Sequence, residues 1–178
     1  MRIISGKYKG KRISAPKKLP VRPTTDMAKE ALFNILNNQY YFEDVSVLDL
    51  FSGTGNISFE FASRATATIT AVDNHTGCAK FISKIAEELN FEINVLKNDV
   101  FKFLERTKSK YDIIFADPPY NIDSVEFSKI SELVFSNALL QEDGLLIIEH
   151  GEQTDLSQLA NFKEKRKYGG NVFSFFKK

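Results

Sequence analysis

Short apolar runs alternate with amphipathic segments through most of the chain. The runs are rich in β-branched and aromatic residues and end at glycine, proline or polar residues, which predicts strands at 45–50, 68–73, 91–96, 111–116 and 144–149. The segments between them repeat apolar residues at helical spacing, which predicts helices at 56–64, 76–89, 100–106, 124–139 and 156–159. This alternation predicts an α/β fold whose mostly parallel sheet is covered on both faces.

Both ends of the chain depart from this alternation. Residues 162–168 and 171–176 flank Gly169-Gly170 and predict a terminal antiparallel hairpin, which brings the expected sheet to seven strands. Near the start, residues 2–13 mix aliphatic, aromatic and basic side chains with glycines at turn positions, which predicts a small N-terminal β-hairpin.

A proline-punctuated connector separates this N-terminal hairpin from the first helix, expected at residues 27–36. Thr24 or Thr25 can cap that helix. We therefore expect a basic hairpin and connector over residues 1–22 and an α/β domain over residues 23–178.

Chemically distinctive residues follow the predicted strands. In doubly wound sheets, ligands bind outside the carboxyl ends of the strands, so residues at these ends are the candidate binding residues. They are Asp49, Phe51, Gly53 and Gly55 at the first strand, Asp73 at the second, and Asn98 and Asp99 at the third. Glycines let the backbone approach a ligand closely, and Asp73 is placed to accept hydrogen bonds from ribose hydroxyls.

The acidity of this edge indicates the kind of cofactor. A dinucleotide site would have a third glycine where this chain has Ser58, and carboxylates repel a pyrophosphate. They suit a cationic cofactor such as S-adenosyl-L-methionine, which carries a sulfonium and an ammonium group.

The fourth strand ends in Asp117-Pro118-Pro119-Tyr120. Each proline fixes its own φ and lacks an N–H, so the Asp117 carboxylate and the Pro118 carbonyl form a rigid pair of acceptors. A planar base with an exocyclic amino group can donate to both while it stacks on Tyr120. We predict Asp117, Pro118 and Tyr120 as catalytic residues.

Charge is distributed unevenly along the chain, although the net charge is only +1. Residues 1–22 contain eight Lys and Arg and no acidic residue, and residues 163–178 contain six Lys and Arg and one Glu, so the middle is strongly acidic. Basic ends on an acidic body predict a polyanionic partner. The candidate RNA-binding residues are Arg2, Lys7, Lys9, Lys11, Arg12, Arg22 and Thr24.

Composition bears on membrane contact, location and metal binding. No segment has the roughly 18 apolar residues of a membrane helix, so we expect no membrane partner and a cytoplasmic location. Cys78 is the single cysteine and the two histidines are far apart, so we expect no metal site. Nothing in the sequence demands more than a monomer.

These motifs together resemble a known family. The core resembles class I S-adenosylmethionine-dependent methyltransferases, with their Rossmann-like fold. The hairpin at residues 2–13, the blocks at 22–26, 30–36 and 49–55, and Asp-Pro-Pro-Tyr at 117–120 are similar to the RsmD family. The resemblance implies methyl transfer to N2 of one guanine in small-subunit (16S) ribosomal RNA, either as naked RNA or in an assembling small ribosomal subunit.

Three alternatives remain open on the sequence. The same tetrapeptide can hold the amino group of adenine, so an adenine-N6 methyltransferase acting on RNA or DNA is the nearest one. A nicotinamide-dependent oxidoreductase is disfavoured by Ser58 and the acidic edge. A non-catalytic RNA-binding assembly factor could also have this fold, because a fold does not establish an activity.

Overall fold

A seven-stranded sheet forms the centre of the protein in the computed structural model, which describes residues 1–16, 18–19, 24–119 and 122–178. The strand order is β3-β2-β1-β4-β5-β7-β6. The first five strands run parallel, and β7 lies antiparallel to both β5 and β6. The strands are β1 (Ser46–Leu50), β2 (Thr68–Asp73), β3 (Ile93–Lys97), β4 (Tyr111–Ala116), β5 (Leu140–Gly151), β6 (Phe162–Tyr168) and β7 (Asn171–Phe176).

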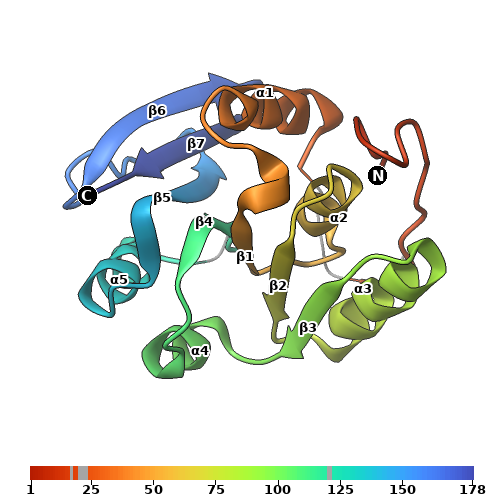
Figure 1. Cartoon of the computed structure of the whole chain (residues 1–178). Coiled ribbons are helices and arrows are strands. Elements are labelled where there is room, and N and C mark those ends of the chain that lie inside the picture. The colour runs from red at the N-terminus through yellow and green to blue at the C-terminus, as the bar shows by residue number, and fades with distance from the viewer. Residues whose placement is uncertain (17, 20–23, 120–121) are drawn as a thin grey trace.

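Helices cover both faces of the sheet (Figure 1). They are α1 (Asp26–Asn37), α2 (Asn56–Ser63), α3 (Thr76–Leu89), α4 (Val100–Arg106) and α5 (Ser124–Ser136), and a 3-10 turn, η1 (Phe42–Asp44), precedes β1. The strands alternate their apolar side chains between the two faces. In β4, Ile114 packs with the side chains of α4 and α5, whereas Ile113 and Phe115 pack with those of α1 and α2.

This architecture confirms the predicted class I methyltransferase fold, with corrections at single elements. The prediction of a helix at residues 156–159 is wrong. The segment forms a turn, closed by a backbone hydrogen bond from Leu159 N to Leu156 O (3.1 Å). Helix α5 ends at Ser136 rather than at residue 139, since Ala138 adopts a left-handed conformation (φ 51°). Strand β5 is longer than expected and begins at Leu140.

The N-terminal hairpin is present as one antiparallel bridge, Arg2 to Arg12, flanked by backbone bonds such as Ile3 N to Lys11 O (2.9 Å). Ile3 and Ile13 are buried in the same apolar cluster as Phe59 of α2. The described part of the hairpin therefore contributes to the core of the domain. Residues 20–23, where we expect the boundary between the two units, lie outside the described residues.

No helix in the described ranges is long and apolar enough to cross a membrane.

Candidate active site

The loop between β1 and α2 carries the first group of candidate cofactor-binding residues. Its backbone has positive φ at Phe51 (55°), Gly53 (52°) and Gly55 (76°), so it turns sharply at the carboxyl end of the sheet. A Cβ on Gly55 would lie 2.9 Å from Ile82 Cγ1, so glycine is needed there for close packing on α3 as well as for its conformation. The Phe51 ring meets Phe101 of α4 edge-to-face, at 6.2 Å between centroids.

Asp73 connects this loop to the next strand. One of its oxygens accepts from Gly53 N (2.8 Å) and the other from His75 N (2.8 Å). The Asn98 N–H donates to the backbone carbonyl of Asp73 (3.0 Å), which brings the ends of β2 and β3 together. Each carboxylate oxygen can accept a second hydrogen bond. Asp73 is therefore positioned by the backbone and still able to bind a hydroxyl pair.

Asp99 and Asp49 have clear structural partners. Asp99 caps α4 by accepting from Lys102 N (2.9 Å). Asp49 is buried beneath the glycine loop and accepts from both the backbone N–H and the hydroxyl of Ser58. Burial raises the pKa of Asp49 to about 7, despite these bonds. Ser58 stands where a dinucleotide-binding site would have a third glycine. Its two hydrogen bonds fix Asp49 to the first turn of α2.

Asp117 follows β4, and its N–H donates to Leu50 O of β1 (3.3 Å). Enclosure by protein raises the pKa of the Asp117 carboxyl well above its usual value, and the charges of Glu149 and Asp49 raise it further. Pro118 is buried beside it. The predicted stacking residue Tyr120 lies outside the described residues, as does the predicted phosphate-binding residue Arg22.

A pocket that is partly open to solvent lies next to Asp117. Its lining comes from the ends of β4, β5 and β7 and from α5, and includes Asp117, Pro118, Phe127, Glu149, His150 and Asn171. Glu149 is a second buried carboxylate, with its pKa raised by burial. It accepts from the Thr24 hydroxyl (2.7 Å) and from the Asn171 side-chain amide.

Thr24 therefore occupies a different position from the one expected. It is 5% exposed and forms part of the support for Glu149, so its hydroxyl does not face a polyanion on the surface. The neighbouring Thr25 caps α1 by accepting from Ala28 N (3.2 Å).

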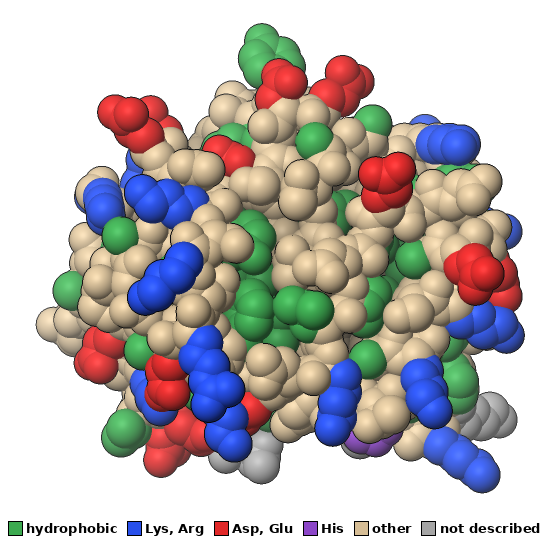
Figure 2. Space-filling model, turned by 60° about the horizontal axis from the view of Figure 1, so that its bottom comes forward, with side chains coloured by type: hydrophobic (Ala, Val, Ile, Leu, Met, Phe, Trp, Pro, Cys, Tyr) green, Lys and Arg blue, Asp and Glu red, His purple; other side chains and the backbone are tan. Residues whose placement is uncertain are grey.

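The predicted RNA-binding residues of the hairpin are on the surface. Lys7, Lys9, Lys11 and Arg12 are exposed, whereas Arg2 is half-exposed and paired with Asp26 (3.0 Å). On the face of the molecule shown in Figure 2, Lys and Arg side chains border a central group of hydrophobic side chains, with acidic residues among them.

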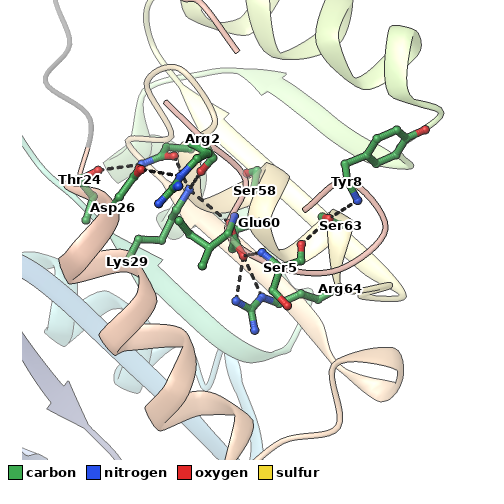
Figure 3. A network of polar contacts seen from close by, with 12 residues as sticks. Arg2, Ser5, Tyr8, Thr24, Asp26, Lys29, Ser58, Glu60, Ser63 and Arg64 are labelled. Carbon is green, nitrogen blue, oxygen red and sulfur yellow. Dashed lines mark hydrogen bonds and ion pairs between the residues drawn. The ribbon is translucent and has the colours of Figure 1, made fainter. Parts of the chain in front are cut away.

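A buried ionic network attaches the hairpin to the domain (Figure 3). Glu60 of α2 accepts from the backbone N–H groups of Ile4 (2.8 Å) and Ser5 (3.0 Å), and pairs with Arg64 (2.9 Å). It also pairs with Lys29 of α1 (3.3 Å), and both of these side chains are almost fully buried. Neither Lys29 nor Glu60 is among the residues that the sequence pattern predicts for the site.

Lys29 also links the hairpin to the pocket. Its ammonium donates to Arg2 O (2.6 Å) and to Asn56 Oδ1 (2.8 Å), at the start of α2. The Asn56 amide donates to Thr24 O (3.0 Å), and the Thr24 hydroxyl donates to Glu149. A continuous set of hydrogen bonds therefore runs from the hairpin, past the glycine loop, to the pocket.

A family model described as conserved hypothetical protein 95 matches residues 1–177. The chain is 32% identical to ribosomal RNA small subunit methyltransferase D of Buchnera aphidicola (subspecies Baizongia pistaciae), over 84% of this chain and 75% of the relative. The chain belongs to the RsmD family. The Escherichia coli K12 protein with the same printed name is 28% identical, over 97% of this chain and 86% of its own length.

A solved structure of a more distant methyltransferase shares the fold of this RsmD-family chain. It is the Thermus thermophilus 16S rRNA N2 G1207 methyltransferase in complex with AdoMet and guanosine, with a TM-score of 0.71 and 21% identity. The match covers 90% of this chain and 45% of that one.

Proposed function

We propose that this RsmD-family protein transfers a methyl group from S-adenosyl-L-methionine to the exocyclic N2 of a guanine in small-subunit ribosomal RNA. Family membership supports an rRNA methyltransferase. The observation that carries the finer proposal is the position of Asp117 and Pro118 at the carboxyl end of β4, beside a pocket that contains a second carboxylate.

The residues at the sheet edge fit the proposed cofactor. Asp73 accepts from the backbone of the glycine loop, Asp49 lies buried against Ser58, and Asp99 adds a third carboxyl group at this edge. Phe51, Gly53, Gly55 and Asn98 complete the residues that we assign to cofactor binding. S-adenosyl-L-methionine supplies an electrophilic methyl group on a cationic sulfur.

Asp117 and Pro118 act on the guanine amino group in this proposal. The N2 lone pair is delocalised into the ring, so N2 is a weak nucleophile. When Asp117 and the Pro118 carbonyl each accept one N2–H bond, they stabilise the positive charge that develops on N2 as its bond to the methyl carbon forms and the carbon–sulfur bond breaks. Because the pKa of Asp117 is raised, its carboxylate is also suited to take the proton that N2 then loses. Tyr120 would stack on the base.

Asp73→Ala tests the cofactor site. We expect it to weaken the affinity for S-adenosyl-L-methionine by about 10- to 100-fold, since two hydroxyl donors lose a charged acceptor. The loop also loses its bond from Gly53 N. Isothermal titration measures the affinity, and the control is Asp155→Ala, which removes an exposed aspartate that pairs with Lys165 of β6. An unchanged affinity would exclude the ribose role.

The hairpin is best tested by charge removal, because deletion of residues 1–22 would also remove Ile3 and Ile13 from the core. We expect Lys7→Gln, Lys9→Gln and Lys11→Gln together to reduce the slope of log affinity for small-subunit RNA against log salt by about 2 to 3. The reason is that each phosphate contact releases counterions on binding, so a variant with fewer contacts releases fewer of them.

The matched control changes three exposed cations at the amino end of β4, namely Arg106, Lys108 and Lys110, to glutamine. Filter binding at several salt concentrations gives both slopes. Equal slopes for the two triple variants would reject the hairpin as the RNA contact.

A transfer assay with radiolabelled S-adenosyl-L-methionine tests the activity itself. Its acceptors are naked small-subunit RNA, small subunits lacking methylation, and duplex DNA, followed by nucleoside analysis. We expect the label in N2-methylguanosine. Label in N6-methyladenosine would overturn the proposed base, and absence of label despite cofactor binding would overturn the proposed activity.

A further inference from the structure

Glu149 is a buried carboxylate whose hydrogen-bond donors among the described residues are neutral. It lies near the end of β5 and is 3% exposed. One of its oxygens accepts from the Thr24 hydroxyl and the other from the Asn171 amide. None of the ion pairs between described residues includes it.

The two hydrogen bonds of Glu149 use both of its oxygens, but neither donor neutralises its charge. A buried charge without a cation is costly, and two neutral donors compensate only part of that cost. Asp117 and Asp49 are also acidic, and the charge of Glu149 raises the pKa of both carboxyl groups. Glu149 therefore lowers the stability of the fold, and it lines a pocket beside the predicted catalytic residue Asp117. Both observations indicate that Glu149 has a function in that pocket.

The support of Glu149 also fixes its direction. Thr24 precedes α1 and Asn171 begins β7, so the side chain is held from two elements that are distant in sequence. Each of its oxygens has one further lone pair for a donor inside the pocket. Glu149 and Asp117 therefore present acceptors to the same pocket from neighbouring strands, β5 and β4.

We propose that Glu149 accepts a hydrogen bond from N1–H of the target guanine, while Asp117 accepts one from N2–H, and that Glu149 thereby selects guanine over adenine. This assignment rests on the proposed function. Guanine has two adjacent donor positions on its Watson–Crick edge, N1–H and the N2 amino group. Adenine has an amino donor next to an unprotonated N1, whose lone pair would face a carboxylate oxygen. A pocket with two adjacent carboxylates thus fits guanine and disfavours adenine.

Glu149 is consequently a specificity-determining residue, distinct from the group that contacts the reacting nitrogen. Burial raises its pKa, and a donor bound at N1 would favour the charged form again. The rate-limiting chemistry at N2 would still depend on Asp117.

The test replaces the target guanine, once it has been mapped, by 2,6-diaminopurine in full-length small-subunit RNA. This analogue keeps the N2 amino group but has no N1–H. We expect the wild-type protein to methylate it with a kcat/KM about 10- to 100-fold lower than for guanine, because a hydrogen bond to a charged acceptor is lost. Equal kcat/KM values for the two RNAs would overturn the proposal.

Variants of the protein complete the test. We expect Glu149→Gln to lower kcat/KM on guanine RNA by about 10- to 100-fold and to bring the ratio between the two RNAs close to one. Glu152→Gln is the matched control, because it removes a carboxylate only three positions after Glu149 in the chain. Glu152 is exposed and pairs with Lys167. A wild-type ratio in Glu149→Gln would overturn the proposal.

Folding and activity are controlled separately. S-adenosyl-L-methionine affinity reports whether Glu149→Gln is folded, and the analogue experiment on the wild-type protein stands if it is not. If wild-type protein forms no N2-methylguanosine on unaltered RNA, the proposed function itself fails. If it does form N2-methylguanosine but accepts 2,6-diaminopurine equally, only the role of Glu149 fails.

Discussion

Asp117→Ala is expected to reduce methyl transfer by about 10²- to 10⁴-fold, while the affinity for S-adenosyl-L-methionine stays within about twofold of wild type. The substitution removes the carboxylate that we assign to the guanine amino group and leaves only the neutral Pro118 carbonyl of the assigned pair. The cofactor residues that we assign lie at the ends of β1, β2 and β3, apart from Asp99 at the start of α4. Single-turnover transfer and isothermal titration measure the two quantities.

Asp117→Asn separates the two roles assigned to this carboxylate. An amide oxygen still accepts a hydrogen bond but takes no proton at neutral pH. If Asp117 accepts only, Asn should retain more activity than Ala; if it also takes the proton, Asn and Ala should be similarly impaired. Asp143→Ala removes an exposed carboxylate at the surface and serves as the control. Near wild-type transfer by Asp117→Ala would contradict the proposed mechanism.

Lys29→Met is expected to lower the free energy of unfolding by about 3 to 5 kcal/mol. Lys29 is 1% exposed, and its ammonium contacts Glu60, Asn56 and the backbone carbonyl of Arg2. Burial lowers the pKa of Lys29, although Glu60 opposes this effect. Removal of the cation leaves Glu60 buried with less compensation and removes one of the contacts between the N-terminal hairpin and α1.

Urea denaturation measures the loss, with Lys84→Met as the matched control. Lys84 forms an exposed pair with Glu88 of the same helix at 3.7 Å, so its removal should cost less than about 0.5 kcal/mol. Lys29→Met combined with Glu60→Gln should be more stable than the sum of the single losses predicts, because the uncompensated charge is removed too. Equal losses for Lys29→Met and Lys84→Met would contradict the role of the network.

The sequence predicted the strands and most of the helices because each of them has a strong local pattern. Helices α3 and α4 and strands β2, β4, β6 and β7 agree with the expectation to the residue. The differences are at ends that depend on single backbone conformations, such as the left-handed Ala138 after α5. A four-residue segment such as 156–159 contains too little periodicity to separate a helix from a turn.

The predicted site was incomplete where residues act through partners that are distant in the sequence. Glu149 ends an apolar run and resembles any polar residue at the end of a strand; its role depends on Thr24, 125 positions earlier in the chain. Lys29 had a local signal, since it is one turn before Phe33 on the buried face of α1, whereas Met27 is 59% exposed. A lysine at an apolar position indicates a buried partner, but the sequence does not identify Glu60 as that partner.

The strand order of the sheet has a consequence for synthesis on the ribosome. Strand β7 is made after both β5 and β6, yet it lies between them and buries Phe173 and Phe176 in the core. A nascent chain that has reached residue 170 has completed β5 but leaves the edge that β7 will cover open to other strands. Until residues 171–176 leave the exit tunnel, the two apolar clusters to which Phe173 and Phe176 belong remain incomplete, so a translation pause just after residue 170 should increase aggregation.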